Sequence, residues 1–280
     1  MESPLVSTDW LAENLNDPNI HIADASWYLP AQNRDGAAEY AEAHIPGAIF
    51  WDIDAVADTE SGLPHTMPDA ASFERHMEEL GIGSDHFIVL YDGLGLFSAA
   101  RPWWMLRAFG HENCAILDGG FVKWRAEGRA VSADKPKMAP AKFNANYNSA
   151  MMHNLEAMLK NLETGDAQIL DARASGRFQG TEPEPRPNSR SGHIPGSLNL
   201  PYDQLLDPEH KTVLPPDDLT QKFADAGIDL SRPVVTSCGS GVTACILALG
   251  FLLSGKTDIS VYDGSWSEWG THPDTPVETG

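Results

Sequence analysis

The sequence contains few cysteines and few basic residues for its length. Its three cysteines, Cys114, Cys238 and Cys245, are an odd number, and their spacing fits neither a disulfide framework nor a zinc site. Lysine and arginine together number 19 against 40 acidic residues, which gives a formal net charge of −21. This acidity argues against nucleic acid or an anionic membrane as a partner. The sequence therefore predicts no metal site and a small-molecule substrate rather than a polyanion.

Long apolar runs and a secretory leader are also missing. The longest apolar run, residues 244–253, is too short to cross a bilayer. The first residues, Met1-Glu-Ser-Pro-Leu-Val, lack the basic region and apolar stretch of a signal peptide. We therefore expect a soluble protein of a reducing compartment, the cytoplasm.

The sequence repeats itself once, at an offset of about 145–149 residues. The repeated landmarks keep the same order in both halves, which indicates a duplicated domain. They are His44-Ile-Pro-Gly and His193-Ile-Pro-Gly, Ile22-Ala-Asp24-Ala and Leu170-Asp171-Ala, and Leu117-Asp-Gly-Gly-Phe-Val-Lys-Trp and Tyr262-Asp-Gly-Ser-Trp-Ser-Glu-Trp.

Each half alternates short apolar strands with helical stretches. Residues 87–91 and 234–237 are predicted strands, and residues 72–80 and 217–226 are predicted helices. Such alternation is typical of an α/β domain with a mainly parallel sheet flanked by helices. We expect an inactive domain over residues 1–134, a linker over 135–152 and a catalytic domain over 153–280, in line with the usual size of domains.

One segment of the second half is built to carry a nucleophile. A β-branched strand ends at Cys238, and a glycine-rich loop then leads into an apolar helix at Ala244. The first N–H groups of a helix have no intrahelical partner and carry partial positive charge. Glycines let further N–H groups converge on an anion, and a thiolate is such an anion. We therefore predict that Cys238 is the catalytic nucleophile, that the loop residues Gly239, Gly241, Val242 and Thr243 bind the substrate, and that Cys114 and Cys245 belong to the core.

The segment Cys238-Gly-Ser-Gly-Val-Thr-Ala resembles the active-site loop of the rhodanese family, in the branch that uses 3-mercaptopyruvate. The branch that uses thiosulfate is similar but carries Cys-Arg-Lys-Gly there. Through the repeat, the resemblance covers nearly the whole chain and implies two tandem rhodanese-like domains, the first of them inactive. In the first half Asp92 stands where the second has Cys238, and a carboxylate cannot carry a persulfide.

Two arginines lie in the turn-rich segment 171–187. Arg177 and Arg186 can hold a carboxylate with their planar donors, or they can form salt bridges with Glu182 or Glu184. The resemblance implies that the arginines matching Arg177 and Arg186 bind the carboxylate and keto end of the substrate. Arg173 has no such match, and we expect it in a structural ion pair.

The resemblance also implies a proton relay of Asp54, His65 and Ser240. In such a relay the acid orients the histidine, and the histidine moves a proton through the serine hydroxyl. From the residues alone, His65 is an ordinary loop histidine. His44 and His193 recur in both halves, one of them inactive, and are expected to be structural.

Together these features predict an enzyme that moves sulfur from 3-mercaptopyruvate through a persulfide on Cys238 to a thiol acceptor such as thioredoxin, or to cyanide. Pyruvate is released, and no cofactor is needed. The alternatives are a thiosulfate:cyanide sulfurtransferase and a non-enzymatic persulfide carrier. Gly239 and Ser240 disfavour the former, because a dianionic donor suits basic residues. A phosphatase of this fold would need an arginine where the chain has Ala244.

Overall fold

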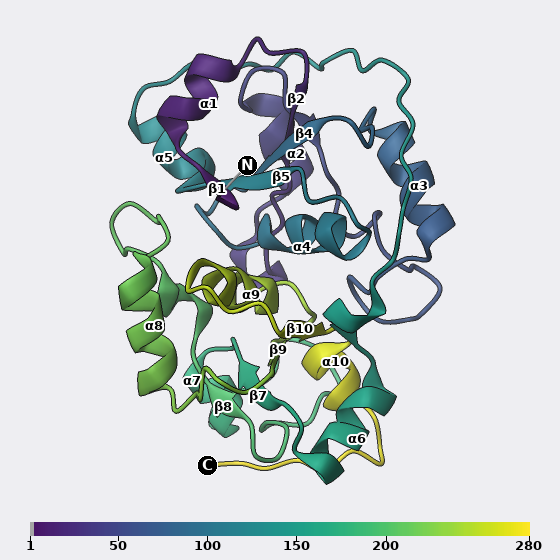
Figure 1. Cartoon of the computed structure of the whole chain (residues 1–280), viewed down its shortest axis with the longest axis vertical. Coiled ribbons are helices and arrows are strands. Elements are labelled where there is room, and N and C mark those ends of the chain that lie inside the picture. The colour runs from purple at the N-terminus through teal and green to yellow at the C-terminus, as the bar shows by residue number, and fades with distance from the viewer. Residues whose placement is uncertain (1–2) are drawn as a thin grey trace. The chain divides into compact units, whose positions relative to one another are not determined.

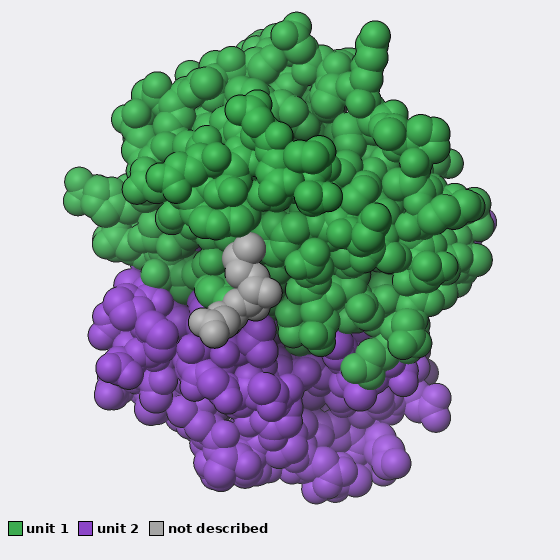
Figure 2. Space-filling view, turned by 45° about the horizontal axis from the view of Figure 1, so that its top comes forward, with its two compact units in different colours: residues 1–57, 68–148, 207–213 green, residues 58–67, 149–206, 214–280 purple. Residues whose placement is uncertain are grey.

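The computed structural model describes residues 3–280, which fold into two compact units. Unit 1 contains the described residues up to Ala57, Pro68–Asn148 and Asp207–Val213, and unit 2 contains Asp58–Met67, Ser149–Leu206 and Leu214–Gly280 (Figure 2). Each unit has one five-stranded parallel sheet, and the two sheets have the same strand order along the repeat. The predicted fold class is therefore confirmed.

Unit 1 has the strand order β1-β5-β4-β2-β3 (Figure 1). Helices α1 and α5 lie side by side, and Lys123 Nζ donates to Thr8 Oγ1 at 2.9 Å. The elements are β1 (Leu5–Val6), α1 (Thr8–Asn14), β2 (Ile20–Asp24), η1 (Pro30–Gln32), α2 (Gly36–Glu42), β3 (Ile49–Phe50), α3 (Ala70–Glu79), β4 (Phe87–Tyr91), α4 (Ala100–Ala108), β5 (Cys114–Leu117) and α5 (Gly120–Ala126).

Unit 2 repeats this order as β6-β10-β9-β7-β8. Helices α8 and α9 pack through the stacked rings of Phe223 and Phe251, whose centroids are 3.7 Å apart. The elements are η2 (Ser149–Met151), β6 (Met152–His153), α6 (Leu155–Thr164), β7 (Gln168–Asp171), α7 (Ser175–Gln179), β8 (Leu198–Asn199), η3 (Tyr202–Leu205), α8 (Pro216–Asp225), β9 (Val234–Ser237), α9 (Ala244–Leu253), β10 (Ile259–Tyr262) and α10 (Ser265–Trp269).

The strands and helices follow from the local sequence. Strands β4 and β9 coincide with their predicted ranges, and every residue in both is buried, as expected for a parallel sheet covered on both faces. Helix α3 starts where Asp69 accepts a hydrogen bond from the Ser72 N–H group, which is an N-cap. Within residues 3–280, no helix combines the length and the apolar character that crossing a membrane requires.

The repeated histidines have the same structural role in both units. His44 stacks on Tyr40, with ring centroids 4.2 Å apart, and bonds to the Tyr40 carbonyl through Nδ1. His193 stacks on Phe178 at 3.8 Å and bonds to the Phe178 carbonyl in the same way. The expectation that these histidines are structural is confirmed.

The compact units differ from the predicted domain boundaries. Residues 135–148 of the predicted linker belong to unit 1, because Phe143 is buried there and its ring meets that of Phe73 edge to face. Two segments also belong to the opposite unit. Asp58–Met67 lies in the first half of the sequence but belongs to unit 2, and Asp207–Val213 lies in the second half but belongs to unit 1. Both result from contacts between residues far apart in sequence.

The last residues of β2 and β7 differ in their charge partners. In unit 2, Asp171 pairs with Arg173 at 2.7 Å. In unit 1, Asp24 instead accepts hydrogen bonds from the Ser26 backbone and hydroxyl. Asp24 is only 2% exposed, and its burial raises its pKa to about 6.

We predict that Asp24→Asn stabilises the protein at neutral pH. The folded state binds the Asp24 proton more tightly than the unfolded state. Protonation of Asp24 therefore adds to the free energy of unfolding at low pH, and this stabilisation is lost as pH rises from about 4 to about 6. The free energy of unfolding of Asp24→Asn relative to the natural chain should therefore rise by roughly 2–3 kcal/mol between pH 4 and pH 7. Urea unfolding across this range tests the prediction, and parallel pH profiles for the two proteins contradict it.

Candidate active site

Cys238 lies at the carboxyl end of a central strand. It follows β9, which is hydrogen-bonded between β10 and β7. In parallel α/β sheets, ligands bind beyond the carboxyl ends of the strands. The loop 239–243 then leads into α9, and Gly241 adopts the left-handed φ of 74° that favours glycine. Thr243, at the N-cap position of α9, makes no side-chain capping hydrogen bond.

The corresponding loop of unit 1 shows what this position attracts. The Asp92 carboxylate there accepts four backbone N–H bonds: one from Leu94 on Oδ1, and three from Phe97, Ser98 and Ala99 on Oδ2, at 2.7–2.9 Å. The loop and the start of α4 thus form an anion site that the chain fills with its own side chain. Because Asp92 occupies the position of Cys238, the loop after β9 corresponds to this anion-binding loop of the first repeat.

Ser265 fixes the backbone of Cys238 from the other side. Its Oγ accepts the Cys238 N–H at 3.2 Å and donates to the Tyr262 carbonyl at 2.8 Å. Ser265 has a φ of 48°, and the matching residue of the first repeat is Gly120, with a φ of 54°. Serine in this left-handed conformation is strained. Ser265 is not among the predicted site residues, although a serine stands here where the first repeat has a glycine.

The two predicted arginines converge on the residue after the cysteine. A Cβ atom placed on Gly239 would lie 3.2 Å from Arg177 Nη2 and 3.7 Å from Arg186 Nη1. Both guanidinium groups therefore flank the nucleophile loop, where they can bind a small anion. The absence of a side chain at Gly239 leaves room for them.

Arg177 also makes one of the alternative salt bridges. It donates to Glu184 through Nη2 at 2.5 Å and through Nε at 3.3 Å. Glu184 is buried, with its side chain 4% exposed, whereas the Arg177 side chain is 19% exposed. The arginine is thus both salt-bridged and adjacent to the loop.

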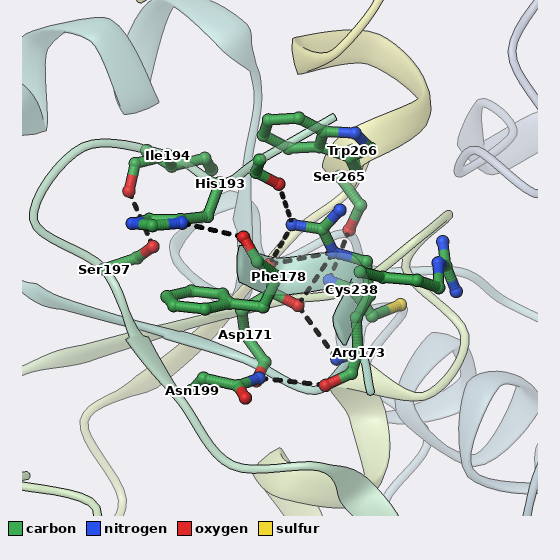
Figure 3. Close-up of polar contacts among 12 residues, drawn as sticks. Asp171, Arg173, Phe178, His193, Ile194, Ser197, Asn199, Cys238, Ser265 and Trp266 are labelled. Atoms are coloured by element: carbon green, nitrogen blue, oxygen red, sulfur yellow. Dashed lines mark hydrogen bonds and ion pairs between the residues drawn. The ribbon is translucent and has the colours of Figure 1, made fainter. Parts of the chain in front are cut away.

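Arg173 forms the predicted structural ion pair. It donates to Asp171 and, through Nη1, to Glu184 at 2.8 Å. Its guanidinium carbon lies 4.3 Å from the centroid of the Trp266 ring, and Figure 3 shows Arg173 between Asp171 and that ring. Burial disfavours its charged form, but Asp171 and Glu184 raise the pKa of Arg173 above its usual value. The backbone N–H of Trp266 donates to the Cys238 carbonyl at 2.9 Å, so this network also borders Cys238.

His65 reaches the same loop. Its Nδ1 lies 2.9 Å from Ser240 Oγ, at hydrogen-bonding distance, and both residues are buried. His65 adopts a φ of 62°, which is uncommon for a residue other than glycine. The segment Asp58–Met67 belongs to unit 2 and is further tied by the Met67 N–H, which donates to Asp263 Oδ2 at 2.9 Å. Two of the three predicted relay residues are therefore together.

Asp54, the third predicted relay residue, belongs to unit 1. Its Oδ2 accepts a hydrogen bond from the indole Nε1 of Trp27 at 2.9 Å. The assignment of Asp54 to orient His65 stays a prediction.

The other two cysteines lie in the core, as expected. Cys114 is buried in β5, where burial raises the pKa of its thiol to about 12, and its Sγ donates to the His111 carbonyl at 3.4 Å. Cys245 is buried in α9, and its Sγ donates to the Gly241 carbonyl at 3.1 Å. Cys238 is also only 1% exposed, so its charged surroundings, and not its exposure, set it apart.

The fold and this loop define a tandem α/β protein with one cysteine-bearing and one cysteine-free anion loop. The family model described as the rhodanese-like domain matches residues 7–127 and 154–272. The chain belongs to the rhodanese family.

Relatives of known name cover almost the whole chain. The 3-mercaptopyruvate sulfurtransferase of Rattus norvegicus is 45% identical over 95% of this chain and 91% of its own. The thiosulfate sulfurtransferase of the same organism is 43% identical over 99% of this chain and 95% of its own. The crystal structure of SseA from Escherichia coli, described as a 3-mercaptopyruvate sulfotransferase, superimposes with a TM-score of 0.86 at 38% identity, covering 95% of this chain and 100% of that one.

We predict that Ser265→Ala and Ser265→Gly separate stability from activity. Alanine removes the Cys238 hydrogen bond, at a cost of about 1 kcal/mol, and keeps the strained φ. Glycine removes the bond and also relieves the strain, as at Gly120, so it should be the more stable variant in urea unfolding. Both should lower kcat/KM for sulfur transfer by roughly tenfold, about 1.4 kcal/mol. Full activity of the glycine variant would contradict the role of Ser265 in placing the nucleophile.

Proposed function

We propose that the protein transfers sulfur from 3-mercaptopyruvate to a thiol acceptor through a persulfide on Cys238. The observation that carries this proposal is the convergence of the Arg177 and Arg186 guanidinium groups on Gly239, next to the cysteine. A 2-oxo acid offers a carboxylate and a keto oxygen to such a pair of donors. The relatives named 3-mercaptopyruvate sulfurtransferase, at 45% identity, support the same substrate.

The loading step uses the Cys238 side chain and backbone N–H groups of the chain. The Cys238 thiolate attacks the sulfur of mercaptopyruvate, so that a sulfur–sulfur bond forms while the carbon–sulfur bond breaks. The electron pair of the broken bond leaves with the carbon as the enolate of pyruvate. N–H groups of the loop and of α9 stabilise the negative charge around the sulfur atoms.

Ser240 and His65 supply the proton that the enolate needs. Their hydrogen bond of 2.9 Å lets the serine hydroxyl give a proton to the departing carbon while His65 replaces it. We assign Asp54 to this relay as the residue that orients His65.

A thiol acceptor completes the cycle. Its thiolate attacks the outer sulfur of the persulfide, which returns the Cys238 thiolate and carries the sulfur away. Thioredoxin or a small thiol fits this step, and cyanide can take the same sulfur as thiocyanate. A cytoplasmic location stays part of the proposal.

Thiosulfate is the second candidate donor. It is favoured by the relatives named thiosulfate sulfurtransferase, at 43% identity. The loop favours mercaptopyruvate instead, because Gly239 and Ser240 carry no charge where the thiosulfate branch has arginine and lysine. A carrier without turnover is disfavoured by the assembled site, since a carrier needs no pair of substrate arginines.

We predict that Cys238→Ser abolishes sulfur transfer, whereas Cys245→Ser and Cys114→Ser keep it. Intact-mass spectrometry after incubation with mercaptopyruvate should show a gain of one sulfur atom on the peptide that contains Cys238. Cys245→Ser should cost on the order of 1 kcal/mol of stability, because a buried thiol becomes a hydroxyl. Pyruvate release or sulfur loading in the Cys238 variant contradicts the proposed nucleophile.

We also predict that Ser240→Ala and His65→Gln slow pyruvate release by roughly 100-fold in kcat, the usual size of a general acid–base contribution. Thiosulfate releases sulfite and leaves no carbon to protonate, so loading of Cys238 from thiosulfate should fall much less. His76→Gln, a half-buried histidine of α3 outside the site, is the control. An equal loss with both donors shows that the pair shapes the loop and delivers no proton.

A further inference from the structure

Glu184 joins the two arginines that border the substrate site. Its Oε1 accepts from Arg173 Nη1 at 2.8 Å and from Arg177 Nε at 3.3 Å, and its Oε2 accepts from Arg177 Nη2 at 2.5 Å. The side chain of Glu184 is 4% exposed, so water screens these interactions weakly. Glu184 is thus the buried counter-charge of Arg177.

The chain of ion pairs begins at the sheet. Asp171 ends β7 and pairs with Ser237, the residue before Cys238, in the strand register. Arg173 is bound by Asp171, by the Gly192 carbonyl at 2.8 Å and by the Trp266 ring. Because Arg173 is fixed, Glu184 is fixed, and Glu184 in turn fixes the orientation of Arg177.

The Arg177–Glu184 ion pair carries little net charge, although the guanidinium still offers donors. Its Nε and Nη2 are engaged by Glu184, and its Nη1 lies 4.0 Å from a Cβ placed on Gly239, somewhat farther than Nη2 at 3.2 Å. A carboxylate can accept a hydrogen bond from this group. A second negative charge on the ligand gains little, because the Glu184 carboxylate repels it through the same buried environment.

We propose that Glu184 is a specificity-determining residue: by compensating the charge of Arg177, it favours monoanionic sulfur donors over dianionic ones. The inference rests on the proposed sulfur-transfer function and deepens it. Mercaptopyruvate carries one carboxylate, whereas thiosulfate carries two negative charges next to the transferred sulfur. Glu184 acts through Arg177 and is a positioning residue with respect to the substrate.

The test compares the two donors on one variant. Glu184→Gln keeps the size of the side chain and removes its charge, while its amide nitrogen cannot accept from Arg177. The rate of persulfide formation on Cys238 is followed by intact mass with mercaptopyruvate and with thiosulfate. Loading by mercaptopyruvate should fall, and the ratio of kcat/KM for thiosulfate to that for mercaptopyruvate should rise by about tenfold. A loss of folded protein lowers both rates equally and leaves the ratio unchanged.

Two further variants separate charge from shape. Glu184→Asp keeps the charge on a shorter side chain, so its donor ratio should stay near that of the natural chain even where KM rises for both donors. Glu182→Gln removes a neighbouring exposed acid and should change neither the ratio nor the rates. An equal shift of the ratio in Glu184→Asp and Glu184→Gln overturns the proposal.

Two further outcomes distinguish a failure of the Glu184 proposal from a failure of the proposed function. A donor ratio in Glu184→Gln that matches the natural chain, in an enzyme active on mercaptopyruvate, overturns the role of Glu184 alone. A natural chain that takes no sulfur from mercaptopyruvate overturns the proposed function itself.

Discussion

The structure depends on one arrangement: the central strand of each sheet ends at a loop and a helix whose N–H groups can hold an anion. In unit 1 this anion is the carboxylate of Asp92, which four backbone N–H groups bind. In unit 2 the same position holds Cys238. A side-chain carboxylate satisfies the loop permanently, whereas a thiolate satisfies it and can still react. At the strand end itself, the two units thus differ in one residue, Asp92 against Cys238.

Comparison of the two repeats shows where unit 2 has a strained backbone that unit 1 avoids. Gly120 of unit 1 takes a left-handed φ without strain, and Ser265 takes the same conformation with a side chain. The gain is a hydroxyl that binds the Cys238 N–H. Likewise, the buried acid at the end of β2 bonds to Ser26 and Tyr91 and has no arginine partner among the described residues, whereas Asp171 pairs with Arg173 and, through it, is linked to Glu184. These interactions of unit 2 lie around Cys238 and the segment that follows β7.

The sequence predicts the parts of this architecture that are local or repeated. Apolar β-branched runs locate β4 and β9 to the residue, because their side chains are buried on both faces of a sheet. The glycine loop identifies Cys238 because its chemistry lies within seven consecutive residues. The boundaries of the units were not predictable, since the placement of Asp58–Met67 follows from contacts with distant residues. Glu184 appeared only as one possible salt-bridge partner, because pattern alone does not fix the conformation of a turn-rich loop.

The chain carries a formal net charge of −21 and still builds an anion site. Long-range attraction does not explain this, because screening limits it to about 8–10 Å at physiological salt. The site instead uses arginines beside a helix amino end, and it pairs two of them with buried acids. Buried counter-charges reduce the cost of keeping several guanidinium groups together, which would otherwise repel one another. Binding of an anion then depends on the orientation of the guanidinium N–H groups and less on the net charge of the protein. An acidic protein can therefore bind an anion without a wide basic surface.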